Sequence, residues 1–217
     1  MEKELSQNDP RITAYFEDLL VPEDKILEEV RIMGIEAGLP QIQVGKHDAR
    51  HLEVLTRSFN ASSAVEIGTL GGYSGISIVR GLQKNGKLFT FEMSEKHASV
   101  ARKAFVRAGI SENVEIFLGP ALDNLSKIET RAPFDLVFID ADKGNYCKYF
   151  QWAKKVLRVG GVILADNTFA WGQVFDRNTN DETVKALQKY NDMAARDPEF
   201  RTTIIPTCEG LTMSVRI

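Results

Sequence analysis

The sequence predicts an α/β fold, a doubly wound and mostly parallel seven-stranded sheet with helices on both faces. Between residues 64 and 165, short segments rich in Val, Ile, Leu and Phe alternate with helical patterns. Strands that are apolar almost throughout and separated by helices are typical of a parallel sheet covered on both faces. The last two apolar segments are joined by the turn PTCEG. This turn is too short for a crossover, so we expect an antiparallel hairpin at one edge of the sheet.

The first 60 residues predict a helical cover. Apolar residues recur at helical spacing over 12–20, Pro22 opens a second segment that runs to Met33, and a third helical segment spans 47–59. The pattern leaves open whether these helices belong to the core or only cover it.

The alternating part follows in order. The predicted strands are 64–67, 87–91, 114–118, 134–139 and 161–165, and the hairpin strands are 201–205 and 211–217. The predicted helices are 74–82, 95–108, 121–128, 146–157 and 181–196. Right-handed crossovers between the parallel strands then give the doubly wound arrangement.

The composition of the chain narrows the classes of function that it can have. Of the 217 residues, 43% are hydrophobic and 26% are charged, which is ordinary for one α/β domain with its own core, so we expect residues 1–217 to form a single domain. The net charge of -3 offers no general attraction for nucleic acid or an anionic membrane. No signal core or membrane-length apolar run is present. Cys147 and Cys208 have no metal-ligand spacing, and we interpret them as reduced thiols in a cytoplasmic protein.

The stretch VEIGTLGGYSG, from Val65 to Gly75, combines a strand, a glycine turn and a helix start, where backbone N–H groups meet a ligand. It lacks the G-x-G-x-x-G pattern of dinucleotide sites, and Glu66 favours a cationic or amine-bearing ligand over a diphosphate. Glu92 ends the next strand, where an acid commonly accepts both hydroxyls of a ribose. These features indicate an adenosine ligand. The alternative is a turn that serves packing only, with Glu92 beside a helix N-terminus.

Two carboxylates end neighbouring strand patterns, Asp140 after FDLVFI and Asp166 after GVILA. If these strands are adjacent, about 4.8 Å apart, both side chains can close on one cation, and Asn167 adds a neutral oxygen. An all-oxygen set suits Mg²⁺ or Ca²⁺ rather than zinc. Lys143, near such a cation, can act as a general base. Taken singly, each Asp can be a turn or cap residue and Lys143 a surface residue.

The histidines carry less information. His47 and His51 lack the zinc signature H-E-x-x-H and are interpreted as ordinary helix residues. His97 has no partner that the sequence identifies.

The segments VEIGTLGGYSG, LFTFEMSE, FDLVFIDADKGNY and VILADNTFAWG, preceded by AYFEDLLVPED and GLPQIQV, resemble the metal-dependent class I S-adenosylmethionine O-methyltransferases, the group of caffeoyl-CoA and catechol O-methyltransferases, and their bacterial members in particular. The resemblance covers nearly the whole chain. It implies that S-adenosylmethionine contacts Val44, Glu66, Gly68, Thr69, Ser74, Glu92, Pro120, Ala121, Asp140 and Asp142. It implies Asp140, Asp166 and Asn167 as metal ligands, Lys143 with Asp140 as catalytic residues, and a homodimer.

The implied reaction is divalent-metal-dependent methyl transfer from S-adenosylmethionine to a hydroxyl of a catechol-like acceptor, a vicinal diphenol such as a caffeoyl group. A phenol has a pKa of about 10, so deprotonation at neutral pH costs about 4 kcal/mol, which a directly bound cation can supply. Two vicinal oxygens would also align the attacking one.

Two other function classes stay open at this stage. A nicotinamide-dependent oxidoreductase shares the fold class and the acid after the second strand but would carry G-x-G-x-x-G. A non-catalytic S-adenosylmethionine-binding module would not need Asp140, Lys143, Asp166 and Asn167 together.

Overall fold

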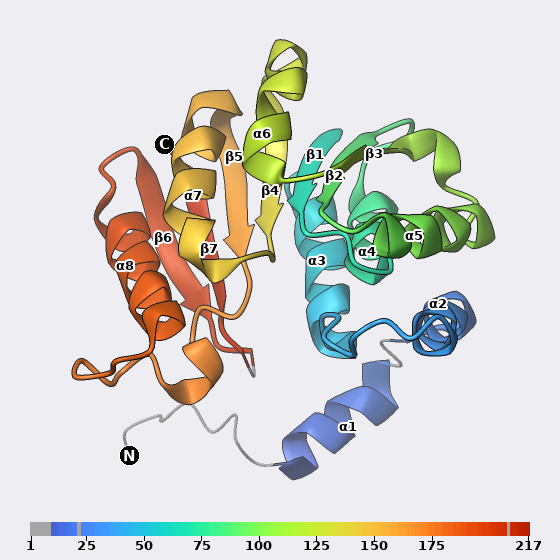
Figure 1. Ribbon diagram of the computed structural model, residues 1–217, viewed down its shortest axis with the longest axis horizontal. Coiled ribbons are helices and arrows are strands. Elements are labelled where there is room, and N and C mark those ends of the chain that lie inside the picture. Colours follow the sequence, from blue (N-terminus) through green and yellow to red (C-terminus); the bar gives the residue numbers. More distant parts are fainter. Residues whose placement is uncertain (1–9, 21–22, 208) are drawn as a thin grey trace.

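The computed structural model describes residues 10–20, 23–207 and 209–217. Within these residues a seven-stranded sheet has the order β3-β2-β1-β4-β5-β7-β6 (Figure 1). The strands are β1 Ser63–Ile67, β2 Lys87–Glu92, β3 Val114–Leu118, β4 Phe134–Ile139, β5 Leu157–Ala165, β6 Phe200–Ile205 and β7 Leu211–Arg216. Strands β1 to β5 pair in parallel, and β7 pairs antiparallel with both β5 and β6. The predicted fold class and the edge hairpin are confirmed.

The helices are α1 Pro10–Leu20, α2 Lys25–Glu36, α3 Lys46–Ser58, α4 Tyr73–Gly81, α5 Glu95–Arg107, α6 Ala121–Asn124, α7 Tyr146–Val156 and α8 Glu182–Arg196. Helix α2 begins after Asp24, whose side chain accepts hydrogen bonds from two backbone N–H groups of the first turn. Pro22, the predicted start, and Cys208 lie outside the described residues.

The predicted helical segment 121–128 is helical, but it is not one continuous α-helix. It is a single α-turn, α6, followed by the 3₁₀ segment Leu125–Arg131. Asn124 donates to the carbonyl oxygens of Leu118 at 3.3 Å and Pro120 at 2.9 Å, which fixes the turn locally. Leu125 and Ile128 are both buried, and their spacing of three fits the 3₁₀ period.

The start of β5 also differs from the prediction, because the strand begins at Leu157 rather than residue 161. The glycine pair Gly160 and Gly161 lies inside the strand. The pairing with β4 absorbs it as a register shift between Phe134 and Leu136.

Alternate residues of each central strand face opposite layers, as the period of two requires. Val65 and Ile67 pack with α7 and α8, whereas Ala64 packs with α2, α3, α4 and α5. Helix α3 packs against α4, and α2 packs against α4 and α5, so both extend the helix layer on this side of the sheet, whereas α1 lies apart from the sheet (Figure 1). In the part of the chain that is described, no helix is both long and apolar enough to traverse a bilayer.

The loops after the strands are joined to neighbouring strand ends through the main chain. The N–H of Gly68 donates to the Phe91 carbonyl at 3.0 Å, that of Asp140 to Ile67 at 2.9 Å and that of Asp166 to Ile139 at 3.0 Å. The strand order reverses at β1, which places a crevice at this edge.

Replacing Gly68 tests this arrangement. Its φ is +105°, and an added Cβ would lie 1.9 Å from the carbonyl oxygen of Asp140. Because that oxygen belongs to the main chain of the neighbouring loop, it cannot rotate away. We expect Gly68→Ala to lower the free energy of unfolding by more than about 3 kcal/mol in urea titrations.

Gly144→Ala is the control, since nothing lies within 4 Å of its added Cβ. It should change the free energy of unfolding by less than about 1 kcal/mol. Equal losses in the two variants would contradict the tight approach of the two loops.

Candidate active site

A cavity of about 1750 Å³ opens at the carboxyl ends of the parallel strands. Its size exceeds that of a typical single-ligand pocket, about 300 to 1,000 Å³, and so allows a nucleoside and a second molecule together. The predicted site residues that line it are Val44, Gly68, Thr69, Ser74, Glu92, Pro120, Ala121, Asp140, Asp142, Lys143 and Asn167. Glu66 and Asp166 are buried behind its wall, 0% and 3% exposed.

Glu92 is held at the end of β2 by two backbone groups. Its Oε2 accepts from the N–H of Leu70 at 2.7 Å, and its Oε1 accepts from the N–H of Ser94 at 2.9 Å. His97, for which the sequence offered no partner, has its Nδ1 3.1 Å from Glu92 Oε1. The sequence signal that could have indicated this contact is position, because His97 lies in the first turn of the helix that follows Glu92.

Glu66 lies beneath the start of α4 rather than in the cavity. Its Oε1 accepts from the Ser74 hydroxyl at 2.7 Å and its Oε2 from the Thr90 hydroxyl at 2.6 Å. The Thr90 hydroxyl also lies 2.6 Å from that of Thr69. Burial raises the pKa of Glu66 to about 7, with smaller contributions from the charges of Asp140 and Glu92. The carboxyl group therefore holds Ser74, and Ser74 faces the cavity.

An ion-pair cluster missed from the sequence joins the helical cover to α4. The carboxylate of Glu23 accepts from both Nε and Nη2 of Arg31, at 2.9 and 3.0 Å, and from the Tyr73 hydroxyl at 2.8 Å. Burial opposes ionisation of Glu23, but these hydrogen bonds lower its pKa. Glu23 and Tyr73 are 50 residues apart, so only the fold brings them together.

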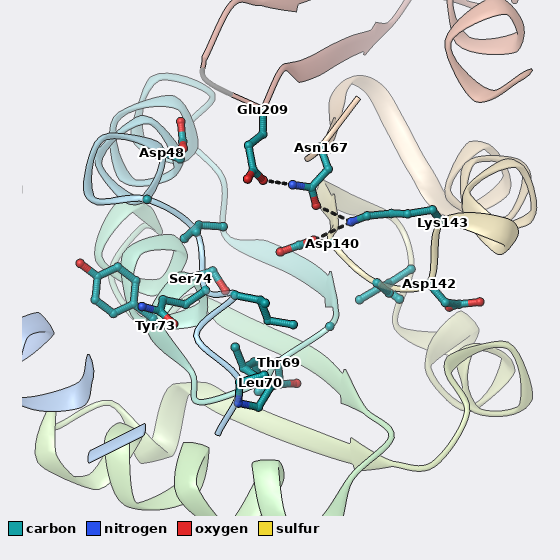
Figure 2. A pocket seen from close by; sticks show the side chains of 18 of the residues that line it. Asp48, Thr69, Leu70, Tyr73, Ser74, Asp140, Asp142, Lys143, Asn167 and Glu209 are labelled. Carbon is teal, nitrogen blue, oxygen red and sulfur yellow. Dashed lines mark hydrogen bonds and ion pairs between the residues drawn. The ribbon is translucent and has the colours of Figure 1, made fainter. Parts of the chain in front are cut away.

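A second polar cluster lies at the ends of β4 and β5. The Nζ of Lys143 donates to Asp140 Oδ1 at 3.0 Å, to Asn167 Oδ1 at 2.5 Å and to the Tyr146 hydroxyl at 2.7 Å. Figure 2 shows Asp140, Lys143 and Asn167 pointing toward one another across the cavity wall. Burial, followed by the charge of Asp140, raises the pKa of Asp166.

Two further acids face this cluster and were not found from the sequence. Glu209, in the turn between β6 and β7, accepts a hydrogen bond from the side-chain amide of Asn167 (Figure 2). Asp48, from α3, lies on the other side of the same space. Burial raises the pKa of Glu209, and the charges of Asp140 and Asp48 add to this shift.

The oxygens of Asp140, Asp166 and Asn167 are the kind that Mg²⁺ or Ca²⁺ prefers. Asp166 Oδ1 is buried and has no hydrogen-bond partner among the described residues. Within those same residues there is no group of three or more His, Cys, Asp or Glu side chains arranged for a metal. The proposed donors are two carboxylates, from Asp140 and Asp166, and the amide oxygen of Asn167, so they do not make up a group of that kind. The residues present therefore fit a hard divalent cation.

A doubly wound sheet with an acid after β2, a glycine turn after β1 and a wide crevice at the reversal point defines a nucleoside-binding α/β enzyme. The model of the O-methyltransferase family matches residues 17–217, and the chain belongs to that family. The resemblance seen in the sequence is thereby confirmed, as is the expectation of an O-methyltransferase. Family membership favours this activity over an oxidoreductase or a non-catalytic module.

Two curated relatives are similar over most of their length. A catechol O-methyltransferase from Niastella koreensis is 40% identical over 193 residues, 88% of this chain and 87% of the relative. A catechol O-methyltransferase from Mycobacterium tuberculosis is 38% identical over 92% of this chain and 90% of its own. The crystal structure of an O-methyltransferase from Bacillus cereus in complex with SAH has a TM-score of 0.90 and 39% identity, covering 95% of this chain and 97% of that one.

Glu66 makes the stability of the protein depend on pH. Its carboxyl group has an ordinary pKa of 4.5, whereas in the folded chain burial raises its pKa to about 7. Between pH 4.5 and pH 7, Glu66 is protonated in the folded chain but ionised in the unfolded chain. The stabilisation that comes from this bound proton is therefore full below about pH 4.5 and is lost as pH rises through about 7. The loss is about 3 kcal/mol.

The Glu66→Gln variant lacks this titrating group. In the absence of ligands, we expect the free energy of unfolding of the variant to vary less between pH 4.5 and 7.5 than that of the wild type. Urea unfolding measures both profiles. Glu92 and Asp140, the charged neighbours, are present in both proteins, so the difference between the two profiles reports Glu66. Parallel profiles would show that Glu66 is not held in a raised-pKa site.

Proposed function

We propose that this protein transfers a methyl group from S-adenosylmethionine to one hydroxyl of a catechol-like acceptor with the help of Mg²⁺ or Ca²⁺. The observation that carries the proposal is the convergence of Asp140, Lys143 and Asn167 in the same cavity as Glu92 and the glycine turn. The names of the two curated relatives and the SAH bound in the Bacillus cereus structure support it.

The cofactor half is assigned to the ends of β1, β2 and β3. The carboxylate of Glu92 would accept the ribose hydroxyls, and Ser74, at the N-terminus of α4, would meet the methionine portion. Glu66 acts there through Ser74. The other assigned cofactor contacts are Val44, Gly68, Thr69, Pro120, Ala121, Asp140 and Asp142, all of which line the cavity.

In the acceptor half, Asp140, Asp166 and Asn167 would hold the cation. When bound, it supplies positive charge that favours the ionised form of an acceptor hydroxyl. Lys143 is the proposed base: in its neutral form, which a cation bound beside it would favour, its Nζ would receive the hydroxyl proton and become the ammonium ion. Tyr146, which is fully buried, accepts a hydrogen bond from this Nζ at 2.7 Å and so helps to hold it in place.

An aromatic acceptor fits the remaining lining. The residues that line the cavity include Trp171, Phe175, Ile205 and Pro206, and Trp171 and Phe175 are 53% and 80% exposed. Apolar side chains of this size can cover a ring whose two hydroxyls reach the polar cluster.

The proposal includes a cytoplasmic homodimer without nucleic-acid or membrane partners. Helix α1 exposes Tyr15 and Leu19, 61% and 58%, and an apolar helix apart from the sheet suits pairing with a second copy.

Removing divalent cations should abolish most activity. With a catechol acceptor, EDTA should lower turnover by about 100-fold, because a bound cation lowers the barrier by several kcal/mol, and excess Mg²⁺ should restore the rate. A radiolabelled methyl-transfer assay measures this. Turnover that is indifferent to chelation would remove the metal from the proposal.

Lys143→Ala should lower kcat at neutral pH by about 100-fold or more, as expected for loss of a positioned base. Calorimetry with SAH should show cofactor affinity within about twofold of wild type. Lys148→Ala, an exposed lysine on the following helix, is the matched control. A Lys143→Ala protein with full kcat would exclude Lys143 as the base.

A further inference from the structure

The side-chain amide of Asn167 is held from both sides by groups of fixed hydrogen-bonding character. Lys143 is a donor only, and its Nζ lies 2.5 Å from Asn167 Oδ1. Glu209, when ionised, is an acceptor only, and it binds Asn167 Nδ2 (Figure 2). The chemistry of the two partners therefore fixes which end of the amide faces Asp140.

This orientation matters because the two ends of an amide have nearly the same shape. A rotation by 180° exchanges oxygen for nitrogen, and the nitrogen end carries two protons and cannot bind a cation. The main chain does not prevent that rotation. It fixes only where the side chain starts, with φ at 60° and the carbonyl of Asn167 accepting from the N–H of Ala170 at 2.9 Å.

Glu209 is itself placed by the main chain. Its carbonyl accepts from the N–H of Phe169 at 2.9 Å, and the carbonyl of Gly210 accepts from the N–H of Thr168 at 3.0 Å and from the Thr168 hydroxyl at 2.9 Å. Gly210 has a φ of +77°, and a Cβ there would lie 2.6 Å from the ring of Phe169. The turn between β6 and β7 is thus joined directly to the loop that carries Asn167.

We propose that Glu209 is a positioning residue that orients the Asn167 amide so that its oxygen can bind the divalent cation. This inference rests on the proposed function, in which Asn167 is a cation ligand. Partners that orient metal ligands typically change metal affinity by about 10 to 100-fold when removed. Asp48 contributes charge to the same space, but its Oδ1 lies 3.8 Å from Nδ1 of His51, so Asp48 serves as a comparison.

Isothermal titration of the full chain with Mn²⁺ tests the inference, using Glu209→Gln, Glu209→Met and Asp48→Asn. The two Glu209 variants have similar shape and no charge, but only Gln keeps an oxygen that accepts from Asn167 Nδ2. We expect Glu209→Met to raise the Kd about 10 to 100-fold. Glu209→Gln and Asp48→Asn should raise it by less than about fivefold, the part due to charge alone. Thermal unfolding checks that each variant is folded.

Equal Kd values for the Gln and Met variants would overturn the orienting role, as would a loss in Asp48→Asn as large as that in Glu209→Met. Wild-type protein that binds no Mn²⁺ would instead refute the proposed function itself, so the two failures are distinguishable.

Discussion

The close approach of the loop after β1 to the loop after β4 is the constraint on which the site depends. Gly68 leaves room for the Asp140 carbonyl, and the N–H of Asp140 donates back to Ile67. The glycine turn, which we assign to cofactor binding, and the polar cluster around Asp140, which we assign to acceptor binding, are therefore built on adjacent strand ends. Because the next loop is tied in the same way through Asp166 and Ile139, the two halves of the cavity cannot drift apart without disrupting the sheet.

Burial raises the pKa of three carboxyl groups in or behind the cavity wall, Glu66, Asp166 and Glu209, and the charge of Asp140 adds to each shift. Glu66 and Asp166 are almost fully buried. Such an accumulation of carboxyl groups lowers stability in the absence of ligands, and proteins retain it where function requires it. The proposed ligands would balance this negative charge, because S-adenosylmethionine carries a sulfonium and an ammonium group and the second ligand is a divalent cation. Lys143 supplies one positive charge of the protein's own.

The sequence predicted what depends on local pattern. The parallel strands, the edge hairpin and the acids after β2, β4 and β5 follow from apolar runs and their ends. The sequence did not distinguish the kind of helix in 121–128, where the spacing of three between buried residues suited a 3₁₀ segment. The alternation of β1 decides that Glu66 faces the helix layer behind Ser74, a detail that the motif alone did not reveal. Glu23 and Glu209 could not be found, because their partners are 50 and 42 residues away.

We infer that one cavity presents a cofactor and a cation to the same acceptor through these loops. A crystal structure with SAH, Mn²⁺ and a catechol, with the anomalous signal used to locate the metal, tests this most directly. We expect a single Mn²⁺ within about 2.3 Å of oxygens from Asp140, Asp166 and Asn167, both catechol oxygens beside it and the SAH ribose on Glu92. A metal bound elsewhere, or a catechol bound away from Lys143, would contradict the proposed arrangement.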